Sequence, residues 1–438
     1  MNKRPVRVWL SAILMVAVAV SGFAGGQQEG DTAGTEGQEE QTLVLWDIQT
    51  QTTLKEIVDE TAQQFRDDNP DVDFEVVHVQ NDPYKTKLTV AMGADTPPEI
   101  FHTWGGGPLK AYVDAEKVMP INDIVDVLRE THIPAAFDPV TFDGDVYGVP
   151  YGGLTGVFMW YRKDVFDQYG LEPPETWDEL IEVGETLKEN GVVPIALANA
   201  TKWTGSLWYM YLADRVGGED MFVDAYAGTG SFADPGYVRA GEMLMDLVDR
   251  DFFPQGFNGM DYDTGQSRTM LYTGRAGMML MGSWILGAAT AEAPEILDEI
   301  GMFPFPAVTD GDGDPTNLIG SPGQNYFAIA ESSNSKELAG EFLRDYVMND
   351  NWVDFMAENG FVPPVLGADE FVDDPRLKES ALAFERANHV QVYYDQYLPP
   401  ELGENHKDLV QALLGGDMSP REAAEAHQRA YEEYMANQ

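Results

Sequence analysis

Trp104 stands directly before three glycines, in the segment TWGGG, and this pairing suits contact with a bound molecule. Glycine has no Cβ, so the backbone N–H groups of such a segment can approach a ligand closely. The tryptophan ring adds a flat apolar face and one N–H donor. Residues of these types favour non-covalent binding.

Two later segments combine aromatic rings with polar groups. SPGQNYF contains Gln324 and Asn325, whose amides both donate and accept hydrogen bonds. VYYDQY contains Tyr393 and Asp395, a carboxylate among aromatic residues shortly before Pro399–Pro400. We expect Asp395 to contact a ligand, and the alternative is a solvated turn.

Strand ends supply further candidates. Asp47 and Gln49 follow the apolar segment TLVLW, where open α/β sheets carry their ligand-facing loops, and Asn81 follows VDFEVVHV. The competing interpretations are that Trp46 is core and Asp47 caps the next helix, and that Asn81 belongs to a turn.

Trp203, Trp208 and Trp284 are candidates of a different kind, because Trp203 and Trp208 flank the segment TGSL and Trp284 follows the apolar segment AGMMLMGS. Each can present its ring to a ligand or fill the core, since tryptophan is large and highly buried on average. The sequence leaves both interpretations open for each of the three tryptophans.

Catalytic and metal-binding patterns are weak in this chain. Six histidines are scattered without metal-ligand spacing, and TDGDGDPTN lacks the alternating ligands and terminal Glu of an EF-hand loop. Nucleophile-elbow and phosphate-loop motifs are absent from the sequence. We therefore expect no metal and no cofactor.

Composition narrows the class of protein. The chain has 438 residues, 74 Asp and Glu against 27 Lys and Arg, and a net charge of −47, which disfavours nucleic acid as a partner. Such an acidic surface is tolerated in high salt, where charges are screened over short distances, so we infer a saline habitat. Cysteine is absent, which excludes disulfides and N-terminal lipidation on cysteine.

The N-terminus has the pattern of an export signal. Three basic residues precede an apolar stretch from Val8 to Val20, and small residues follow it. We interpret residues 1–24 as a signal peptide and 25–41 as a disordered tether, since the tether has no large apolar residue.

From about residue 42, strand and helix patterns alternate. This order predicts a parallel sheet with right-handed crossovers. The same alternation of strands and helices occurs again further along the chain. Capping-box patterns predict helix starts at Thr176 and Ser419, and Ser333 or Asn334 is expected to cap a third helix.

The ordered set of segments resembles the extracellular sugar-binding proteins of ABC importers. The segments that carry the resemblance are TLVLWDIQT, ADTPPEIFHTWGG, VYGVPYGGLTGVFMWYRKDVF, ETWDELIEVGETLKENGVVPIAL, GRAGMMLMGSW, GQNYFAIAESSNSKELAGEFLRDYV and YYDQYLPPELGE. No one of them is highly specific, but together they span nearly all of residues 42–438.

The resemblance implies a two-lobed α/β periplasmic-binding-protein fold, with several chain crossings as the hinge and a central ligand cleft. It divides the chain into lobe 1, residues 42–151 and 308–349, and lobe 2, residues 152–307 and 350–438. It makes Gly152 and Gly153 hinge and close-approach positions and Tyr151 a cleft residue, with Trp160 nearer the core.

The resemblance also implies the function: high-affinity binding of a carbohydrate, expected to be an oligosaccharide, and delivery to the permease subunits of an ABC importer. We expect a monomeric, non-enzymatic protein in the periplasm. The alternative is a secreted glycoside hydrolase, which also combines cleft aromatics with carboxylates but whose barrel would show about eight successive strand–helix units.

Overall fold

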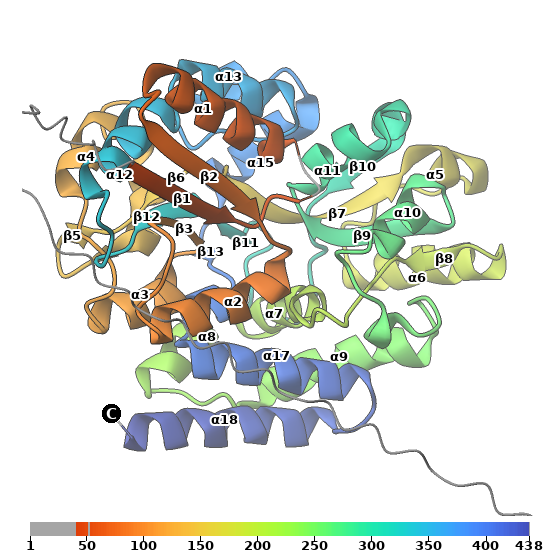
Figure 1. The fold of residues 1–438 in the computed structure, drawn as a ribbon. Helices are drawn as coiled ribbons and strands as arrows, with labels where there is room; N and C mark the ends of the chain where they lie inside the picture. The colour runs from red at the N-terminus through yellow and green to blue at the C-terminus, as the bar shows by residue number, and fades with distance from the viewer. Residues whose placement is uncertain (1–40, 51–52, 438) are drawn as a thin grey trace, which may run out of the picture. The chain divides into compact units, whose positions relative to one another are not determined.

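Two β-sheets organise the chain in the computed structural model, which describes residues 41–50 and 53–437 (Figure 1). The described residues cluster as one compact unit. The predicted signal peptide and all of the predicted tether except Gln41 lie outside the described residues. Gln41 already belongs to the first strand, which therefore begins one residue before the predicted boundary.

The first sheet has the strand order β2-β1-β3-β12-β6. Its strands are β1 Gln41–Asp47, β2 Val72–His78, β3 Ile100–Thr103, β6 Val149–Pro150 and β12 Tyr326–Ile329. The pairs β1–β2 and β1–β3 are parallel, as predicted from the strand–helix alternation, whereas β12 is antiparallel to both of its neighbours. A small hairpin joins β4 Thr141–Phe142 and β5 Asp145–Val146.

The second sheet has the order β13-β11-β7-β9-β8, with β10 paired to β7. Its strands are β7 Thr155–Arg162, β8 Val193–Ile195, β9 Ala276–Gly282, β10 Ile300–Phe303, β11 Leu318–Ser321 and β13 Val390–Gln391. Trp160 of β7 is fully buried here, as expected. Strand β11 belongs to this sheet, which contradicts the assignment of residues 318–321 to lobe 1, because β11 pairs with β7 and β13.

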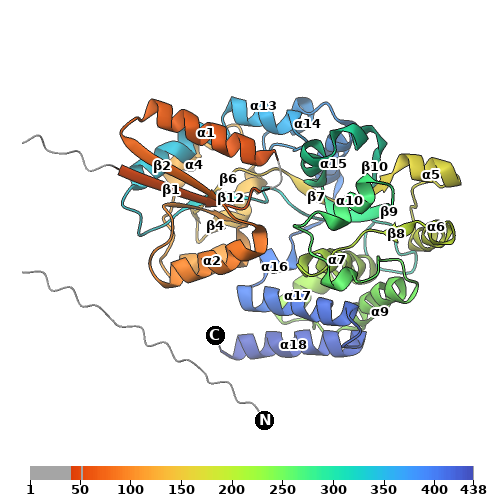
Figure 2. The ribbon, with the colours of Figure 1, turned by 45° about the vertical axis from the view of Figure 1, so that its right-hand side comes forward.

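Helices cover both sheets (Figure 2). Those of the first lobe are α1 Leu54–Asp68, α2 Asn81–Gly93, α3 Gly106–Asp114, α4 Asn122–Leu128, α12 Lys336–Glu341 and α13 Asp350–Glu358. Helix α13 packs on α1, so residues 350–358 also differ from the predicted lobe 2 assignment. The remaining helices are α5 Lys163–Tyr169, α6 Trp177–Glu189, α7 Trp203–Gly217, α8 Glu219–Ala227, α9 Pro235–Asp249, α10 Gln266–Tyr272, α11 Ile285–Glu292, α14 Ala368–Phe371, α15 Pro375–Arg386, α16 Tyr394–Tyr397, α17 Pro400–Leu414 and α18 Pro420–Ala436.

Local sequence explains where several helices begin. Thr176 and Glu179 close a capping box at α6, and Ser419 and Glu422 close another at α18, as predicted. The prediction for α12 is wrong, because its N-cap is Ser335 and no side chain caps it. Ser333 instead accepts the backbone N–H of Ser335 in the turn before the helix.

In the described part of the chain, the backbone passes three times between the sheets, and the crossings are hydrogen-bonded to one another. The carbonyl of Asn325 in the second crossing accepts the N–H groups of Tyr151 and Gly152 in the first, at 2.9 and 3.2 Å. Leu154 N–H donates to Val362 in the third crossing at 2.9 Å. A Cβ on Gly153 would come within 2.3 Å of the Val362 carbonyl oxygen. The absence of a side chain at Gly153 therefore allows these two crossings to approach each other closely.

Candidate functional site

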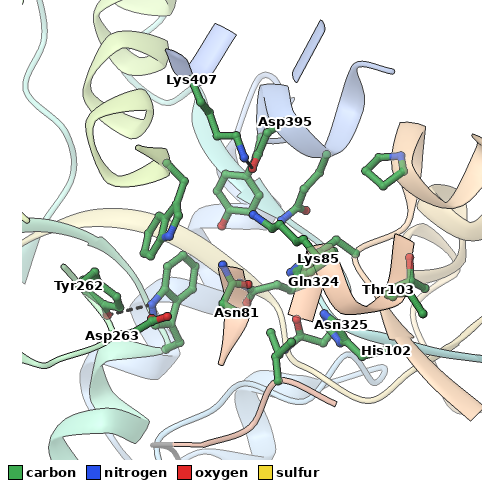
Figure 3. A pocket seen from close by; sticks show the side chains of 18 of the residues that line it. Asn81, Lys85, His102, Thr103, Tyr262, Asp263, Gln324, Asn325, Asp395 and Lys407 are labelled. Carbon is green, nitrogen blue, oxygen red and sulfur yellow. Dashed lines mark hydrogen bonds and ion pairs between the residues drawn. The ribbon is translucent and has the colours of Figure 1, made fainter. Parts of the chain in front are cut away.

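A cavity of about 640 Å³ lies between the two sheets and their helices (Figure 3). Its volume is in the usual range for small-molecule sites, about 300–1,000 Å³. Residues from both lobes and from the crossings line it, including Gln49, Asn81, Lys85, His102, Thr103, Trp104, Gly153, Trp203, Tyr262, Asp263, Arg268, Trp284, Gln324, Asn325, Tyr393, Asp395 and Lys407.

Most of the predicted site residues line this cavity. They are Gln49, Asn81, Trp104, Trp203, Trp284, Gln324, Asn325, Tyr393 and Asp395. For Trp203 and Trp284 the structure therefore favours the cleft over the core, whereas the nearby Trp208 is fully buried. Asn81 is the first residue of α2, where its side chain reaches the cavity.

Asp47 differs from the prediction, because it is fully buried and is not among the lining residues. Its Oδ1 accepts the backbone N–H of Gln49 at 3.1 Å and lies 2.5 Å from Nδ1 of His78. Burial would lower the pKa of His78, but Asp47 and Asp59 outweigh it and raise that pKa. Asp47 thus holds the loop that carries Gln49 and does not itself reach the cavity.

Tyr151 also differs from the prediction. It is fully buried, and its ring stacks on Phe327 with centroids 3.8 Å apart and planes 8° from parallel. Its hydroxyl oxygen lies 3.2 Å from Nε2 of Gln49 and 2.8 Å from Nδ1 of His102, which both line the cavity. Tyr151 therefore positions two cavity residues from behind.

The glycines after Trp104 serve a different purpose from the one expected. A Cβ on Gly106 would meet the carbonyl oxygen of Gln396 at 1.9 Å, and a Cβ on Gly107 would meet that of Leu398 at 2.1 Å. The missing side chains therefore admit the backbone of α16 and the turn after it. Trp104 itself lines the cavity, and Lys85 Nζ lies 5.3 Å from its ring centroid.

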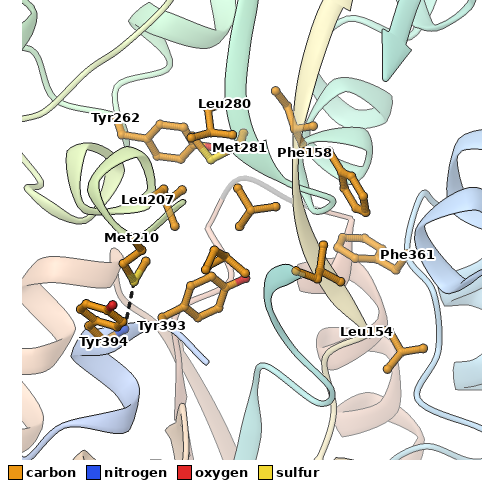
Figure 4. Packing of buried hydrophobic residues seen from close by; sticks show 14 of the residues in the cluster. Leu154, Phe158, Leu207, Met210, Tyr262, Leu280, Met281, Phe361, Tyr393 and Tyr394 are labelled. Atoms are coloured by element: carbon orange, nitrogen blue, oxygen red, sulfur yellow. Dashed lines mark hydrogen bonds between the residues drawn. The ribbon is translucent and has the colours of Figure 1, made fainter. Parts of the chain in front are cut away.

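Four aromatic rings form one wall of the cavity, on the side of the second sheet. Trp203 packs on Tyr262 with centroids 4.9 Å apart and on Trp284 at 6.0 Å, and Trp284 packs on Tyr393 at 6.3 Å. Leu207 and Met210 line the cavity beside these rings, and the buried Met281 belongs to the same apolar cluster (Figure 4). The wall offers extended apolar surface, while the facing lobe contributes amides and Lys85.

Charged groups gather where the lobes meet. Lys407, which is 3% exposed, lies 2.5 Å from a Glu404 carboxylate oxygen and 3.4 Å from one of Asp395. Burial opposes its charge, but Asp395 and Glu404 raise its pKa. On the opposite lobe, burial and then Lys407 lower the pKa of Lys85.

Asp263 faces the first lobe from the second. Burial, followed by the charges of Asp82 and Asp261, raises its pKa to about 6. Because Asp82 belongs to α2, the two lobes present carboxylates toward each other at this edge of the cavity. The nearby charges of Arg268 and Lys85 oppose this rise of the pKa without cancelling it.

Several lining residues were not predicted, among them Lys85, His102, Tyr262, Asp263, Arg268 and Lys407. Lys85 and Lys407 lie on helices, where a single charged residue looks like part of a solvated face. His102 follows two apolar residues in β3, and its position at a strand end was the one signal that could have revealed it.

The site has the composition of a binding cleft. Within residues 41–50 and 53–437, no group of three or more acidic or histidine side chains is arranged to hold a metal ion. Aromatic faces, amides and hydroxyls around a cavity can stack on a flat polar molecule and hydrogen-bond its edges. The two lobes, the triple crossing and the cleft between them define the class of two-lobed binding proteins.

Comparison with known proteins identifies the family. The family model for bacterial extracellular solute-binding proteins matches the sequence over residues 46–360, so the chain belongs to that family. An uncharacterized ABC transporter extracellular-binding protein of Pyrococcus horikoshii is 29% identical over 304 residues, 68% of each chain. The diacetylchitobiose-binding protein of Streptomyces coelicolor is 25% identical over 80% of this chain and 79% of its own length.

Solved structures agree with this assignment. One from work on xylan utilization by the thermophilic bacterium Caldanaerobius polysaccharolyticus superposes with a TM-score of 0.81 at 28% identity. The match covers 89% of this chain and 99% of the other. Members of this family are binding proteins, not enzymes, and these comparisons give no support to the glycoside hydrolase alternative. No helix in the described part of the chain is long and apolar enough to span a bilayer.

Proposed function

We propose that this protein binds an oligosaccharide outside the cytoplasm and delivers it to the permease subunits of an ABC importer. The observation that carries the proposal is the wall of four aromatic rings facing amides across a cavity of about 640 Å³. Sugar rings have apolar faces and polar edges, which match such a wall and the groups opposite it.

Closure of the lobes accompanies binding in this proposal, with Gly152 and Gly153 in the moving crossings. A ligand that touches both lobes favours the closed state by its greater affinity for that state. Micromolar affinity corresponds to about −8 kcal/mol, which stacking and several hydrogen bonds supply after the costs of ordering. We further propose that the protein is exported to the periplasm by residues 1–24 and acts as a monomer.

Calorimetry with a sugar panel tests the proposal. Maltotriose, xylotriose, N,N′-diacetylchitobiose and glucose are titrated into the purified protein, and each mixture is then checked for cleavage. We expect saturable binding of at least one oligosaccharide, tighter than that of glucose, with the sugar recovered intact. New reducing ends above a no-protein control would contradict a binding function, and failure of the whole panel would contradict the oligosaccharide assignment.

A further inference from the structure

The cavity extends beyond the wall of four aromatic rings, along helix α2. Asn81, the first residue of α2, and Val90 near its end both line the cavity. An α-helix rises about 1.5 Å per residue, so this lining extends over about 13 Å. Neighbouring rings of the aromatic wall are 4.9, 6.0 and 6.3 Å apart. The α2 side of the cavity is therefore about twice as long as the distance between two rings of the wall.

The outer arm is the part of the cavity at the C-terminal end of α2. It is lined by Thr86, Thr89 and Val90 of α2, Ala111 and Tyr112 of α3, and Glu404 of α17. Helix α3 packs on α16 and α17, so the outer arm lies where the two lobes meet.

The outer arm is open to solvent, in contrast to the aromatic wall. Val90 is 66% exposed, and Thr89 and Ala111 are exposed as well. Tyr262 and Tyr393 of the wall are buried. A chain molecule that begins against the wall can therefore leave the cleft along α2.

The lining of the outer arm is polar but has no uncompensated acid. The α2 and α3 residues that line the cavity include no carboxylate, although the chain has 74 acidic residues against 27 basic ones. Glu404, on the opposite side, has a carboxylate oxygen 2.5 Å from Nζ of Lys407. Hydroxyl groups beside small apolar side chains match the hydroxyls and the C–H faces of an uncharged sugar.

Tyr112 gives the outer arm an aromatic ring that is held in place. Its side chain is half-buried, and the ring packs edge-to-face on Phe101 with centroids 6.4 Å apart. Its hydroxyl oxygen lies 3.3 Å from Oγ1 of Thr89, which donates to the Lys85 carbonyl at 2.9 Å. Because the side chain is already ordered, contact with a ligand costs little further conformational entropy.

We propose that the outer arm binds the further units of a linear, uncharged oligosaccharide whose first units lie against the aromatic wall. The inference rests on the proposed function and deepens it, because it makes chain length a property that the cleft selects. A chain in the outer arm contacts α2 and α3 of one lobe and α17 of the other. Its added units therefore also favour the closed state.

Calorimetry with sugars of different length tests the inference. The trisaccharide and the hexasaccharide of the maltose, xylose and N-acetylchito-oligosaccharide series are titrated into the purified protein. In a series that binds, we expect the hexasaccharide to bind about tenfold more tightly, the worth of about one further hydrogen bond. Equal affinity for both lengths would overturn the inference and leave the proposed function intact. No binding in any series would contradict the proposed function, and the inference with it.

A matched pair of double variants places the effect in the outer arm. Val90→Glu with Ala111→Glu puts two carboxylates into the arm, and we expect it to abolish most of the gain from trisaccharide to hexasaccharide. The control combines Val127→Glu and Val223→Glu, at positions that are 58% and 49% exposed and do not line the cavity. All four positions are exposed, so we expect melting temperatures close to that of the wild type. Equal gains in the two double variants would overturn the inference.

Methyl NMR spectra of the wild type locate the chain without any change of charge. We expect the methyl signals of Val90 and Ala111 to shift with the hexasaccharide and much less with the trisaccharide, while those of Val127 stay in place with both sugars. The signals are assigned with Val90→Ile, Ala111→Ser and Val127→Ile samples. Equal shifts with both sugars, or no shift with a hexasaccharide that binds, would overturn the inference.

Discussion

Gly107 lies so close to Leu398 that a Cβ at position 107 would come within 2.1 Å of the Leu398 carbonyl oxygen. Gly107 belongs to α3 on the first sheet, whereas Leu398 follows α16, which packs on α17 and through it on α7 of the second lobe. The two lobes therefore meet backbone to backbone beside Trp104 and Asp395. We expect a contact of this kind to depend on how far the lobes are closed.

We predict that Gly107→Ala weakens sugar binding about 5- to 150-fold, because overpacking the closed state costs about 1–3 kcal/mol. Gly107 does not have a positive φ, so the added methyl group acts through space alone. Titration calorimetry with a sugar that binds the wild type measures the effect. Gly93→Ala is the matched control, since a Cβ there meets nothing within 4 Å.

The same pair of variants distinguishes a closed-state contact from a permanent one. If α3 and α16 touch only when the lobes close, the unliganded Gly107→Ala protein melts like the wild type. A lower unliganded melting temperature with unchanged affinity would show that the contact exists in the open protein as well and does not report closure.

Asp395→Asn is expected to weaken sugar binding by about 1.5–3 kcal/mol, the worth of a hydrogen bond to a charged group. It should also lower the melting temperature of the free protein, because Asp395 is one of two carboxylates beside the buried Lys407. Glu404→Gln is the control that removes the other carboxylate. If both variants destabilise the protein and neither weakens binding, Asp395 is a structural partner of Lys407 only.

The alternation of strands and helices along the chain and the position of most cleft residues could be read from the sequence, because alternating apolar segments and strand ends are local signals. Gln49 and Asn81 follow strands, and both reach the cavity. Strand pairing is not local: β11 and β12 lie four residues apart along the chain yet belong to different sheets, since a crossing separates them. The lobe boundary could not be placed there from sequence pattern alone.

Asp47 and Tyr151 show why the depth of a side chain could not be predicted. Each lies two residues before a true cavity residue, Asp47 before Gln49 and Tyr151 before Gly153. A polar residue at a strand end can point into the cleft or support it from behind, and the choice depends on partners that are distant in sequence, here His78 and His102. Lys85 and Lys407 could not be predicted as cavity residues for the same reason, because they face each other only after folding.

Arg215→Met should lower the free energy of unfolding by about 3–5 kcal/mol while sparing sugar affinity, because removing one partner of a buried ion pair leaves the other charge uncompensated. Arg215 is 1% exposed, pairs with Asp214 at 2.5 Å and donates to the carbonyls of Asp314, Pro315 and Asn317. The acidic loop that resembles a calcium loop is thus organised by a guanidinium group.

Urea unfolding of Arg215→Met measures this cost. Arg239→Met is its control, since Arg239 bonds Asp310 of the same loop but its side chain is 35% exposed, and a surface pair contributes about 0–1 kcal/mol. Equal losses in the two variants would contradict the role assigned to the buried guanidinium.

Acid should destabilise the protein through its buried histidines. Burial, and then Lys407, lower the pKa of His406 to about 3, and burial lowers the pKa of His132 to about 4. In the unfolded chain both histidines have a pKa of about 6.5. Below that pH the unfolded state therefore binds protons that the folded state does not bind. Stability is therefore complete above about pH 6.5 and is lost as the pH falls toward the folded pKa values. The raised pKa of the buried Asp47 acts in the opposite direction, which makes the contribution of a single histidine the quantity to measure.

His406→Gln isolates that contribution, because an amide can still hydrogen-bond Ser206, which lies 2.7 Å from Nε2 of His406. Each histidine adds a slope of about 1.4 kcal/mol per pH unit to the free energy of unfolding in this range. We predict that urea titrations between pH 6 and pH 4 give a slope smaller by this amount in His406→Gln than in the wild type, with the two proteins parallel above pH 7. Identical slopes would mean that His406 takes up its proton in the folded state as readily as in the unfolded chain, and that the helices around it open to water before the protein unfolds.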